Sequence, residues 1–207
     1  MRHITIAAYS PMGVSRCFAE ILAGYFPGEW EVLDFTDAGV RKENHFFDQQ
    51  DFIIFAAPSL MGRLPVVEGG IFDHIYANDT PGVFLATFTG QTYGDMLLEL
   101  AQTAEDRGVV GIGAAAFPVP QNTGKIDDMV AEESAGLRSF AKVMDRIFRE
   151  MELTPDYIDG HALKVRGHFP YRHYEEFDAR PRQAGGTSEY FYMRPSKLHS
   201  LSRTLAK

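Results

Sequence analysis

The run of residues 51–58, DFIIFAAP, is almost wholly apolar and sharply limits what this chain can fold into. A run of this kind that ends at a proline is typical of a central strand in a parallel sheet, buried on both faces. Apolar runs at 4–9, 83–88 and 109–117 predict further strands. At 30–35 apolar and acidic residues alternate, which predicts a strand near an edge. The sequence therefore predicts a sheet of five strands.

Helical patterns separate the predicted strands. Apolar residues at helical spacing predict helices over 17–26, 96–104 and 137–151, and a pattern weakened by two glycines predicts one over 66–76. Asp95 is the predicted cap of the helix at 96–104, and a polar loop is expected between the second and third strands. Strands that alternate with helices favour a doubly wound α/β fold with a parallel sheet. Five strands suit the order 2-1-3-4-5, whose ligand site lies at the carboxyl ends of strands one, three and four.

Composition narrows the class of protein. The chain has 207 residues, 45% of them hydrophobic, and no run is long enough to cross a membrane. The N-terminus lacks the features of a signal peptide, and the single cysteine, Cys17, excludes an internal disulfide or a cysteine-held metal cluster. Cys17 lies on the apolar side of the first predicted helix and is interpreted as a small buried hydrophobe. We expect a cytoplasmic protein with no metal site and no catalytic nucleophile.

Charge is unevenly distributed along the chain. The net charge is −8, yet residues 153–207 hold nine Lys or Arg against six Asp or Glu. Residues 1–152 therefore hold the remaining 11 basic and 22 acidic residues. An acidic body repels phosphates, so nucleic acid is not an expected partner. No membrane partner is expected either, because no run is long enough to cross one.

A short turn follows the first predicted strand and opens the first predicted helix. Its sequence is Ser10-Pro11-Met12-Gly13-Val14-Ser15. Backbone N–H groups at a helix start, together with the helix dipole, favour an anion. Neither a dinucleotide fingerprint nor a Walker loop is present, and hydroxyls at both ends of the turn suit a terminal monophosphate. Ser10 and Ser15 are the candidate side-chain donors, and the N–H groups of Met12, Gly13, Val14 and Ser15 form the candidate cradle. The alternative is a purely structural helix cap.

This turn resembles the phosphate loop of flavodoxins, in the Ser-Pro-Thr-Gly-x-Thr form of bacterial flavodoxin–ferredoxin fusion proteins. The segment 58–65, PSLMGRLP, is similar to that family's second loop, and 93–100, YGDMLLEL, to the start of its next helix. Residues 114–117 resemble the fifth strand, and 163–171 the linker before the ferredoxin module. The likeness spans roughly residues 3–172 and implies a flavodoxin-like fold with FMN as cofactor.

The resemblance also implies which residues hold the flavin. Met61 and Gly62 lie where flavodoxins change the orientation of a peptide with redox state, and Leu60, Met61 and Tyr93 would flank the ring. Gly62 as a simple loop glycine and Tyr93 as a packing residue are the structural alternatives. The candidate cofactor-binding residues are Ser10, Met12, Gly13, Val14, Ser15, Pro58, Ser59, Leu60, Met61, Gly62, Thr89, Gly90, Gln91 and Tyr93.

Three departures from the family pattern bear on function. Met12 replaces a loop threonine, which removes one side-chain donor to a phosphate. The third loop is one residue shorter than the family's, with Thr89 in place of an aromatic and Thr92 in place of an arginine. The Cys-rich runs of the ferredoxin module are absent, so no internal iron–sulfur cluster can accept electrons.

These observations lead to two domains and three functional hypotheses. Residues 1–153 form the predicted flavodoxin-like domain, and 154–207 an irregular, aromatic-rich extension expected to pack on the body or on a second subunit of a homodimer. The leading hypothesis is an FMN protein in electron transfer or flavin-dependent reduction, with a redox partner protein or a small-molecule acceptor. The alternatives are a flavodoxin fold that has lost flavin and serves as a binding or scaffold partner, and an FMN-dependent NAD(P)H:quinone-type reductase. Whether the chain is an enzyme or a carrier stays open.

Overall fold

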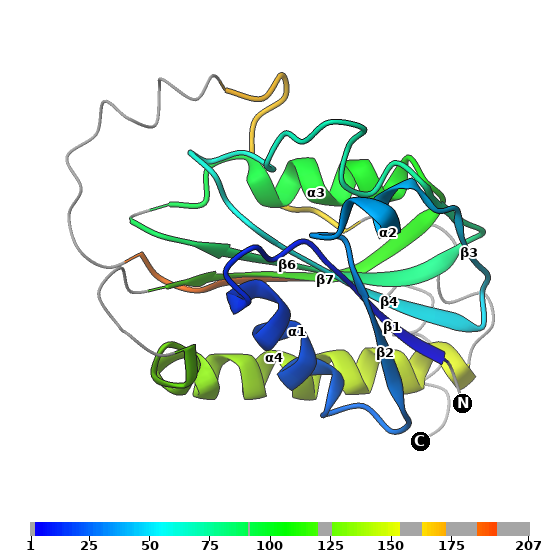
Figure 1. Cartoon of the computed structure of the whole chain (residues 1–207). Coiled ribbons are helices and arrows are strands. Elements are labelled where there is room, and N and C mark those ends of the chain that lie inside the picture. Colours follow the sequence, from blue (N-terminus) through cyan, green and yellow to red (C-terminus); the bar gives the residue numbers. More distant parts are fainter. Residues whose placement is uncertain (1–2, 91, 120–125, 154–162, 173–185, 194–207) are drawn as a thin grey trace.

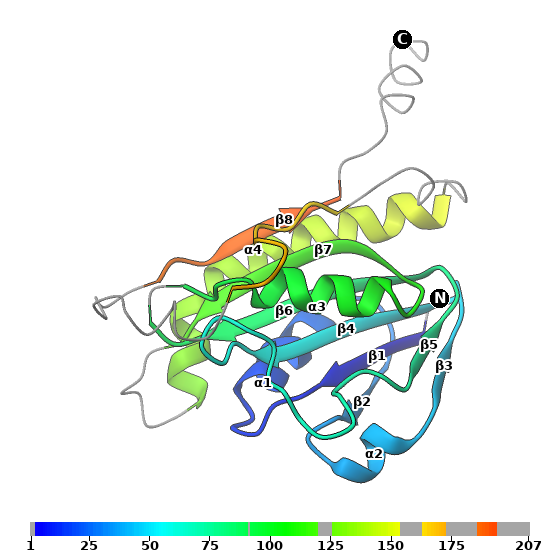
Figure 2. The ribbon, with the colours of Figure 1, turned by 90° about the horizontal axis from the view of Figure 1, so that it is seen from above.

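A six-stranded sheet lies at the centre of the computed structural model, which describes residues 3–90, 92–119, 126–153, 163–172 and 186–193. Its strand order is β2-β1-β4-β6-β7-β8 (Figures 1 and 2). The strands are β1 (His3–Ala8), β2 (Trp30–Asp34), β4 (Asp51–Pro58), β6 (Thr80–Phe88), β7 (Val109–Pro118) and β8 (Glu189–Tyr192). All neighbours pair in parallel except β8, which is antiparallel to β7.

Helices cover both faces of the sheet (Figure 1). α1 (Val14–Ala23) and α4 (Ile126–Leu153) lie on one face, and α3 (Met96–Glu105) lies on the other. The five parallel strands follow the order β2-β1-β4-β6-β7, which is the predicted order 2-1-3-4-5. The prediction of a doubly wound, flavodoxin-like α/β fold is therefore confirmed.

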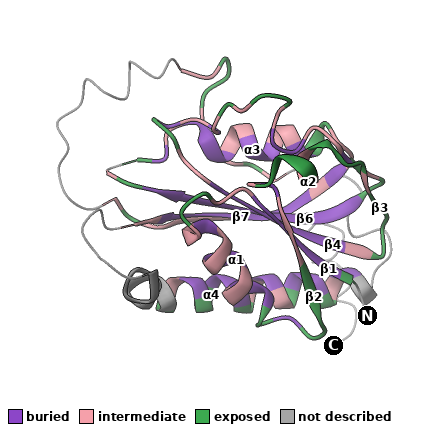
Figure 3. Ribbon diagram, in the orientation of Figure 1, coloured by how far each residue is buried: buried purple, intermediate pink, exposed green. Residues whose placement is uncertain are grey.

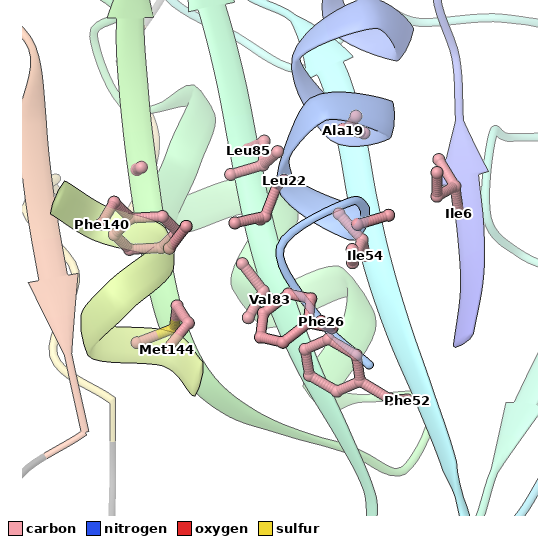
Figure 4. Close-up of a cluster of buried hydrophobic side chains, with 14 of the residues drawn as sticks. Ile6, Ala19, Leu22, Phe26, Phe52, Ile54, Val83, Leu85, Phe140 and Met144 are labelled. Carbon is pink, nitrogen blue, oxygen red and sulfur yellow. The ribbon is translucent and has the colours of Figure 1, made fainter. Parts of the chain in front are cut away.

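The core explains why the apolar runs form the central strands. β4 is buried from Phe52 to Ala57, and every residue of β6 is buried (Figure 3). Because side chains alternate along a strand, Phe52 and Ile54 enter the cluster beneath α1 and α4 (Figure 4), whereas Ile53 and Phe55 enter the cluster beneath α3. Burial of each such side chain stabilises the fold by roughly 1.5–3 kcal/mol.

A second, two-stranded parallel sheet lies beside the main one, formed by β3 (His45–Phe47) and β5 (Ile75–Ala77). The sequence predicts only a polar loop before β4, whereas the structure has β3 and a one-turn helix, α2 (Ala38–Lys42), there. Asp37 begins α2, and its carboxylate accepts a 2.6 Å hydrogen bond from the N–H of Gly39. Elements this short bury too little apolar surface to leave a periodic signal in the sequence.

The predicted helix over 66–76 is wrong. Gly69 and Gly70 have φ of 79° and 72°, in the left-handed region, which breaks a right-handed helix. A Cβ at Gly70 would meet the carboxylate of Asp73, which would have to move, and the positive φ itself favours glycine there. The segment instead forms turns that lead into β5. The first helix also lies three residues earlier than predicted, since α1 runs from Val14 to Ala23.

The C-terminal extension contributes a strand that the sequence does not predict. In β8, Tyr190 and Tyr192 pack against Phe140 of α4, with ring centroids 5.8 Å and 5.6 Å away, and Phe191 packs on the opposite face. The period-two pattern of the sequence YFY fits a strand, but the sequence alone does not say where it pairs. The domain boundary at residue 153 stays a prediction.

Residues 163–172 lie along α3, in the layer outside the sheet (Figure 2). The approach is close, because a Cβ added to Gly167 would stand 2.7 Å from the Cβ of Leu98. Within the described ranges, none of the helices has the length and apolar character needed to span a bilayer.

Candidate functional site

Three loops leave the carboxyl ends of β1, β4 and β6, at the left side of the sheet in Figure 1. Carboxyl ends of adjacent parallel strands meet at one edge, so the segments 9–15, 58–63 and 89–95 lie together. In open α/β sheets of this order, ligands bind at this edge. The candidate residues named from the sequence, apart from Gln91, all fall on these described segments; Gln91 lies outside the described residues.

The first loop is a tight turn that opens α1. The carbonyl of Ser10 accepts a 2.8 Å hydrogen bond from the N–H of Gly13. Gly13 is the N-cap residue directly before α1 and has a φ of 76°. Ser10 Oγ accepts a 3.2 Å hydrogen bond from the N–H of Arg16. Within the described residues, the N–H groups of Met12, Val14 and Ser15 have no hydrogen-bond acceptor. Three of the four N–H groups predicted for the cradle are therefore without an acceptor, whereas the fourth, that of Gly13, is used inside the turn.

The side chains of the first loop are arranged differently from the expectation. Ser15 is only 1% exposed, and its hydroxyl lies 2.7 Å from that of Thr87, at the end of β6. It is turned into the protein and does not face the loop. Met12 is 81% exposed and brings no polar group to the loop. Ser10 is thus the one predicted side-chain donor that remains beside the cradle.

Two carboxylates lie close to the guanidinium of Arg16, in the first turn of α1. Arg16 Nε donates a 2.8 Å hydrogen bond to Glu20, and Asp34 lies 3.7 Å from the same guanidinium. The hydrogen bond to Glu20, opposed by partial burial and aided by the charges of Glu20 and Asp34, raises the pKa of Arg16 above its ordinary value. The cation therefore contributes to local ion pairing at the start of α1.

The second loop is a type I′ turn over residues 60–63. The N–H of Leu60 and the N–H of Arg63 each donate to the carbonyl of the other residue, at 2.9 Å and 3.0 Å. Met61 and Gly62 have φ of 52° and 83°, as this turn requires. Leu60 and Met61 are exposed, whereas the carbonyl of Gly62 accepts a 2.8 Å hydrogen bond from the N–H of Asp95. Ser59, beside Pro58, donates its hydroxyl to the carbonyl of Tyr93.

Arg63 points away from the loops. Its guanidinium donates two 2.7 Å hydrogen bonds to the carboxylate of Glu99 on α3 and a third, at 3.2 Å, to the carbonyl of Arg172. The same group lies 4.7 Å from the centre of the Tyr171 ring. Arg63 therefore joins the second loop, α3 and the C-terminal extension.

In the third loop, Tyr93 is a packing residue in this conformation. It is 3% exposed, its ring meets that of Phe88 at 5.6 Å, and its hydroxyl donates a 2.8 Å hydrogen bond to Glu189 of β8. Burial, followed by the hydrogen bond and charge of Glu189, raises the pKa of Tyr93 well above its ordinary value. Thr89 is exposed, and the carbonyl of Gly90 accepts from the N–H of Gly186.

Asp95 precedes α3 as predicted, but its carboxylate makes no capping hydrogen bond. It accepts instead from the N–H groups of His168 and Arg172, both at 2.9 Å. Burial opposes its ionisation, yet these two hydrogen bonds, the ring of His168 and the charge of Arg172 lower the pKa of Asp95 below its ordinary value. The carboxylate thus ties the C-terminal extension to the third loop.

Sequence reasoning missed the two threonines that anchor the first loop. Thr36 follows β2 and accepts a 2.9 Å hydrogen bond from the N–H of Ser10 through its hydroxyl, while Thr87 pairs with Ser15. The only signal in the sequence is a hydroxyl residue near the carboxyl ends of β2 and β6. Within the described part of the chain, no group of three His, Cys, Asp or Glu residues is placed to hold a metal ion.

Comparisons with protein-family models and with curated proteins gave no match to this chain. Among solved structures it is similar to two-electron reduced flavodoxin from Megasphaera elsdenii, with 16% identity over 61% of this chain and 94% of that one, and a TM-score of 0.36. It is also similar to candidate flavoproteins from Bacteroides uniformis (11% identity, 59% and 92% coverage, TM-score 0.37) and Bacteroides eggerthii (15%, 65% and 98%, TM-score 0.34). The flavodoxin-like fold is assigned on the strand order of the structure itself.

Proposed function

We propose that this chain binds FMN at the carboxyl edge of its sheet and acts in electron transfer or flavin-dependent reduction. The observation that carries the proposal is the meeting of two features at this edge. One is a turn whose N–H groups at Met12, Val14 and Ser15 have no acceptor in the described residues, and the other is an exposed apolar turn at Leu60 and Met61. A ligand with a phosphate and an apolar planar ring matches both.

The fit of FMN to these residues is carried by the main chain. The N–H groups of the first loop and the hydroxyl of Ser10 would hold the phosphate, and Leu60 and Met61 would lie against the ring. The flavin itself would supply the redox chemistry. The 11 basic and 22 acidic residues of 1–152 would favour the less negative, oxidised flavin and so lower its reduction potential. The redox partner is proposed to be a protein or a small-molecule acceptor, and cytoplasmic location stays a prediction.

A second candidate function is a flavodoxin fold without flavin that serves as a binding or scaffold partner. Three side chains favour it: Met12 brings no donor, Ser15 is turned inward, and Tyr93 is buried against Glu189. In this reading the first loop is a helix cap, and the exposed side chains at the carboxyl edge contact another protein.

Purification followed by titration with FMN separates the two candidates. Binding predicts a yellow protein, or quenching of FMN fluorescence when the colourless protein is added. Gly13→Ala should weaken binding, because Gly13 adopts the left-handed conformation that orients the cradle. Gly69→Ala is the matched control, with φ of 79°, no atom within 4 Å of the added Cβ, and a position outside the three loops.

A protein that neither retains FMN nor changes its fluorescence contradicts the flavin proposal and favours the scaffold reading. Equal loss of affinity in Gly13→Ala and Gly69→Ala would mean that general strain, and not the loop, governs binding. For a protein that does bind FMN, mixing with NAD(P)H under anaerobic conditions distinguishes a reductase, in which the flavin absorbance bleaches, from a carrier, in which it does not.

A further inference from the structure

We propose that Thr87 is a positioning residue that fixes the first loop for a phosphate, and that it sets the preference for a phosphorylated over an unphosphorylated flavin. The inference rests on the proposed function. It concerns a residue outside the three loops, at the end of β6, for which the fold alone requires no hydroxyl.

The buried contact between Thr87 and Ser15 joins the first turn of α1 to the sheet. Their hydroxyls lie 2.7 Å apart, and the residues are 4% and 1% exposed, so each hydroxyl is the other's partner away from solvent. Ser15 is the second residue of α1, next to the N–H groups at the helix start. The contact therefore sets the direction in which those groups point relative to β6.

A second contact fixes the opposite end of the loop. The N–H of Ser10 donates to the hydroxyl of Thr36, and Thr36 is itself held by the carboxylate of Asp34, which accepts from its N–H at 2.9 Å. Between these two ties, the loop has the internal hydrogen bond from Gly13 to Ser10. Hydrogen bonds weaken steeply as donor and acceptor lose alignment. The Ser15–Thr87 and Ser10–Thr36 hydrogen bonds therefore determine how well the N–H groups of the loop can bind the same anion.

The hydroxyl of Thr87 reaches the first loop through Ser15. Thr87 also contacts the second loop, but there its main-chain carbonyl accepts a 2.6 Å hydrogen bond from the N–H of Ser59. Any residue at position 87 supplies that carbonyl. Loss of the hydroxyl should therefore loosen the phosphate cradle and leave the turn that meets the ring intact.

Dissociation constants for FMN and riboflavin, measured by fluorescence titration of the full chain, test the inference. Thr87→Val removes the hydroxyl at constant shape and should weaken FMN binding about fivefold, with riboflavin binding changed less than about twofold. Thr87→Ser keeps the hydroxyl and should bind FMN like the wild type. Thr80→Val is the matched control, because it removes a buried hydroxyl at the other end of the same strand, with no partner in the described residues.

The double variant Ser15→Ala/Thr87→Val separates positioning from stability. Removing both hydroxyls leaves no unpaired buried group, so the unfolding midpoint should recover toward that of the wild type while FMN binding stays weak. Recovery of FMN affinity together with stability would overturn the inference, as would equal weakening toward both flavins or an unchanged Thr87→Val. A wild type that binds neither flavin contradicts the proposed function itself, and the inference falls with it.

Discussion

Replacement of Asp95 by Asn should release the C-terminal extension from the third loop. The Asp95 carboxylate is 1% exposed and accepts from the N–H groups of His168 and Arg172, both at 2.9 Å. The ring of His168 lies 3.3 Å from one carboxylate oxygen, and Arg172 Nε lies 3.9 Å from the other. Asn keeps the shape of Asp but loses its charge and presents an NH₂ group to one of the two donors.

The size of the effect follows from these contacts. A hydrogen bond to a charged group contributes about 1.5–3 kcal/mol, and Asn loses one such bond outright while the other becomes neutral. We expect a loss of about 3 kcal/mol, which for a chain of 207 residues lowers the melting temperature by roughly 6–12 °C. If residues 163–172 detach before the body unfolds, the loss is limited to the free energy of their docking.

Equilibrium unfolding in urea and hydrogen exchange at the amides of His168 and Arg172 measure this effect. Exchange at both amides should accelerate in Asp95→Asn. Asp106→Asn is the control at the opposite end of α3, where the side chain is exposed and a change within about 0.5 kcal/mol is expected. Unchanged protection of the two amides would refute the assignment of Asp95 as their acceptor.

The same carboxylate predicts a pH dependence with a definite sign. The pKa of Asp95 is lower in the folded chain than its ordinary value, so the unfolded chain binds the proton more readily. The stabilisation is complete above the ordinary carboxyl pKa and is lost as pH falls through the folded pKa. The stability difference between wild type and Asp95→Asn should therefore stay constant near neutrality and shrink in acid, as followed by urea unfolding at a series of pH values.

Three further substitutions give distinct outcomes. Thr80→Val should raise the free energy of unfolding by about 1 kcal/mol, because the Thr80 hydroxyl is buried with no partner in the described residues; a loss of stability would contradict this. Met12→Thr should tighten FMN binding, since it adds a donor to the cradle, and unchanged or weaker binding would mean that the loop does not hold phosphate as proposed. Met61→Gly should relieve the strain of a φ of 52° and slightly raise the unfolding midpoint, yet weaken FMN binding by loss of an apolar contact. Tighter binding in Met61→Gly would remove Met61 from the proposed site.

The parallel core could be predicted from the sequence because its signal is local and strong. The run 51–58 matches β4 residue for residue. Its burial on both faces could be predicted because a half-exposed strand would alternate apolar with polar residues, and this run is almost wholly apolar. The order of the five parallel strands followed from the β-α alternation, which limits the topology to a few choices.

Contacts between distant segments could not be predicted. The hydroxyl of Ser15 has the same local sequence whether it faces a ligand or Thr87, which lies 72 residues away, and packing decides between them. Asp95 has the sequence signature of a helix cap, but its carboxylate is taken by backbone donors 73 and 77 residues further on. The predicted helix over 66–76 failed because a glycine permits a positive φ without requiring one, so the sequence did not show that Gly69 and Gly70 would break the helix.

The ion pairs near the loops determine which groups of the protein would be left to bind the phosphate of a flavin. Arg16 is paired with Glu20 and Asp34, and Arg63 with Glu99, so carboxylates engage these two guanidinium groups. Under the proposed function, the phosphate would meet backbone N–H groups, whose hydrogen bonds to a charged group contribute about 1.5–3 kcal/mol each, and a helix dipole that contributes about 0.3–1 kcal/mol. Inorganic phosphate should then compete with FMN at the first loop, while the ring would be held separately against the exposed turn at residues 60–61. The first loop would therefore distinguish FMN from riboflavin, which lacks the phosphate, and its threonine anchors would bear on that preference.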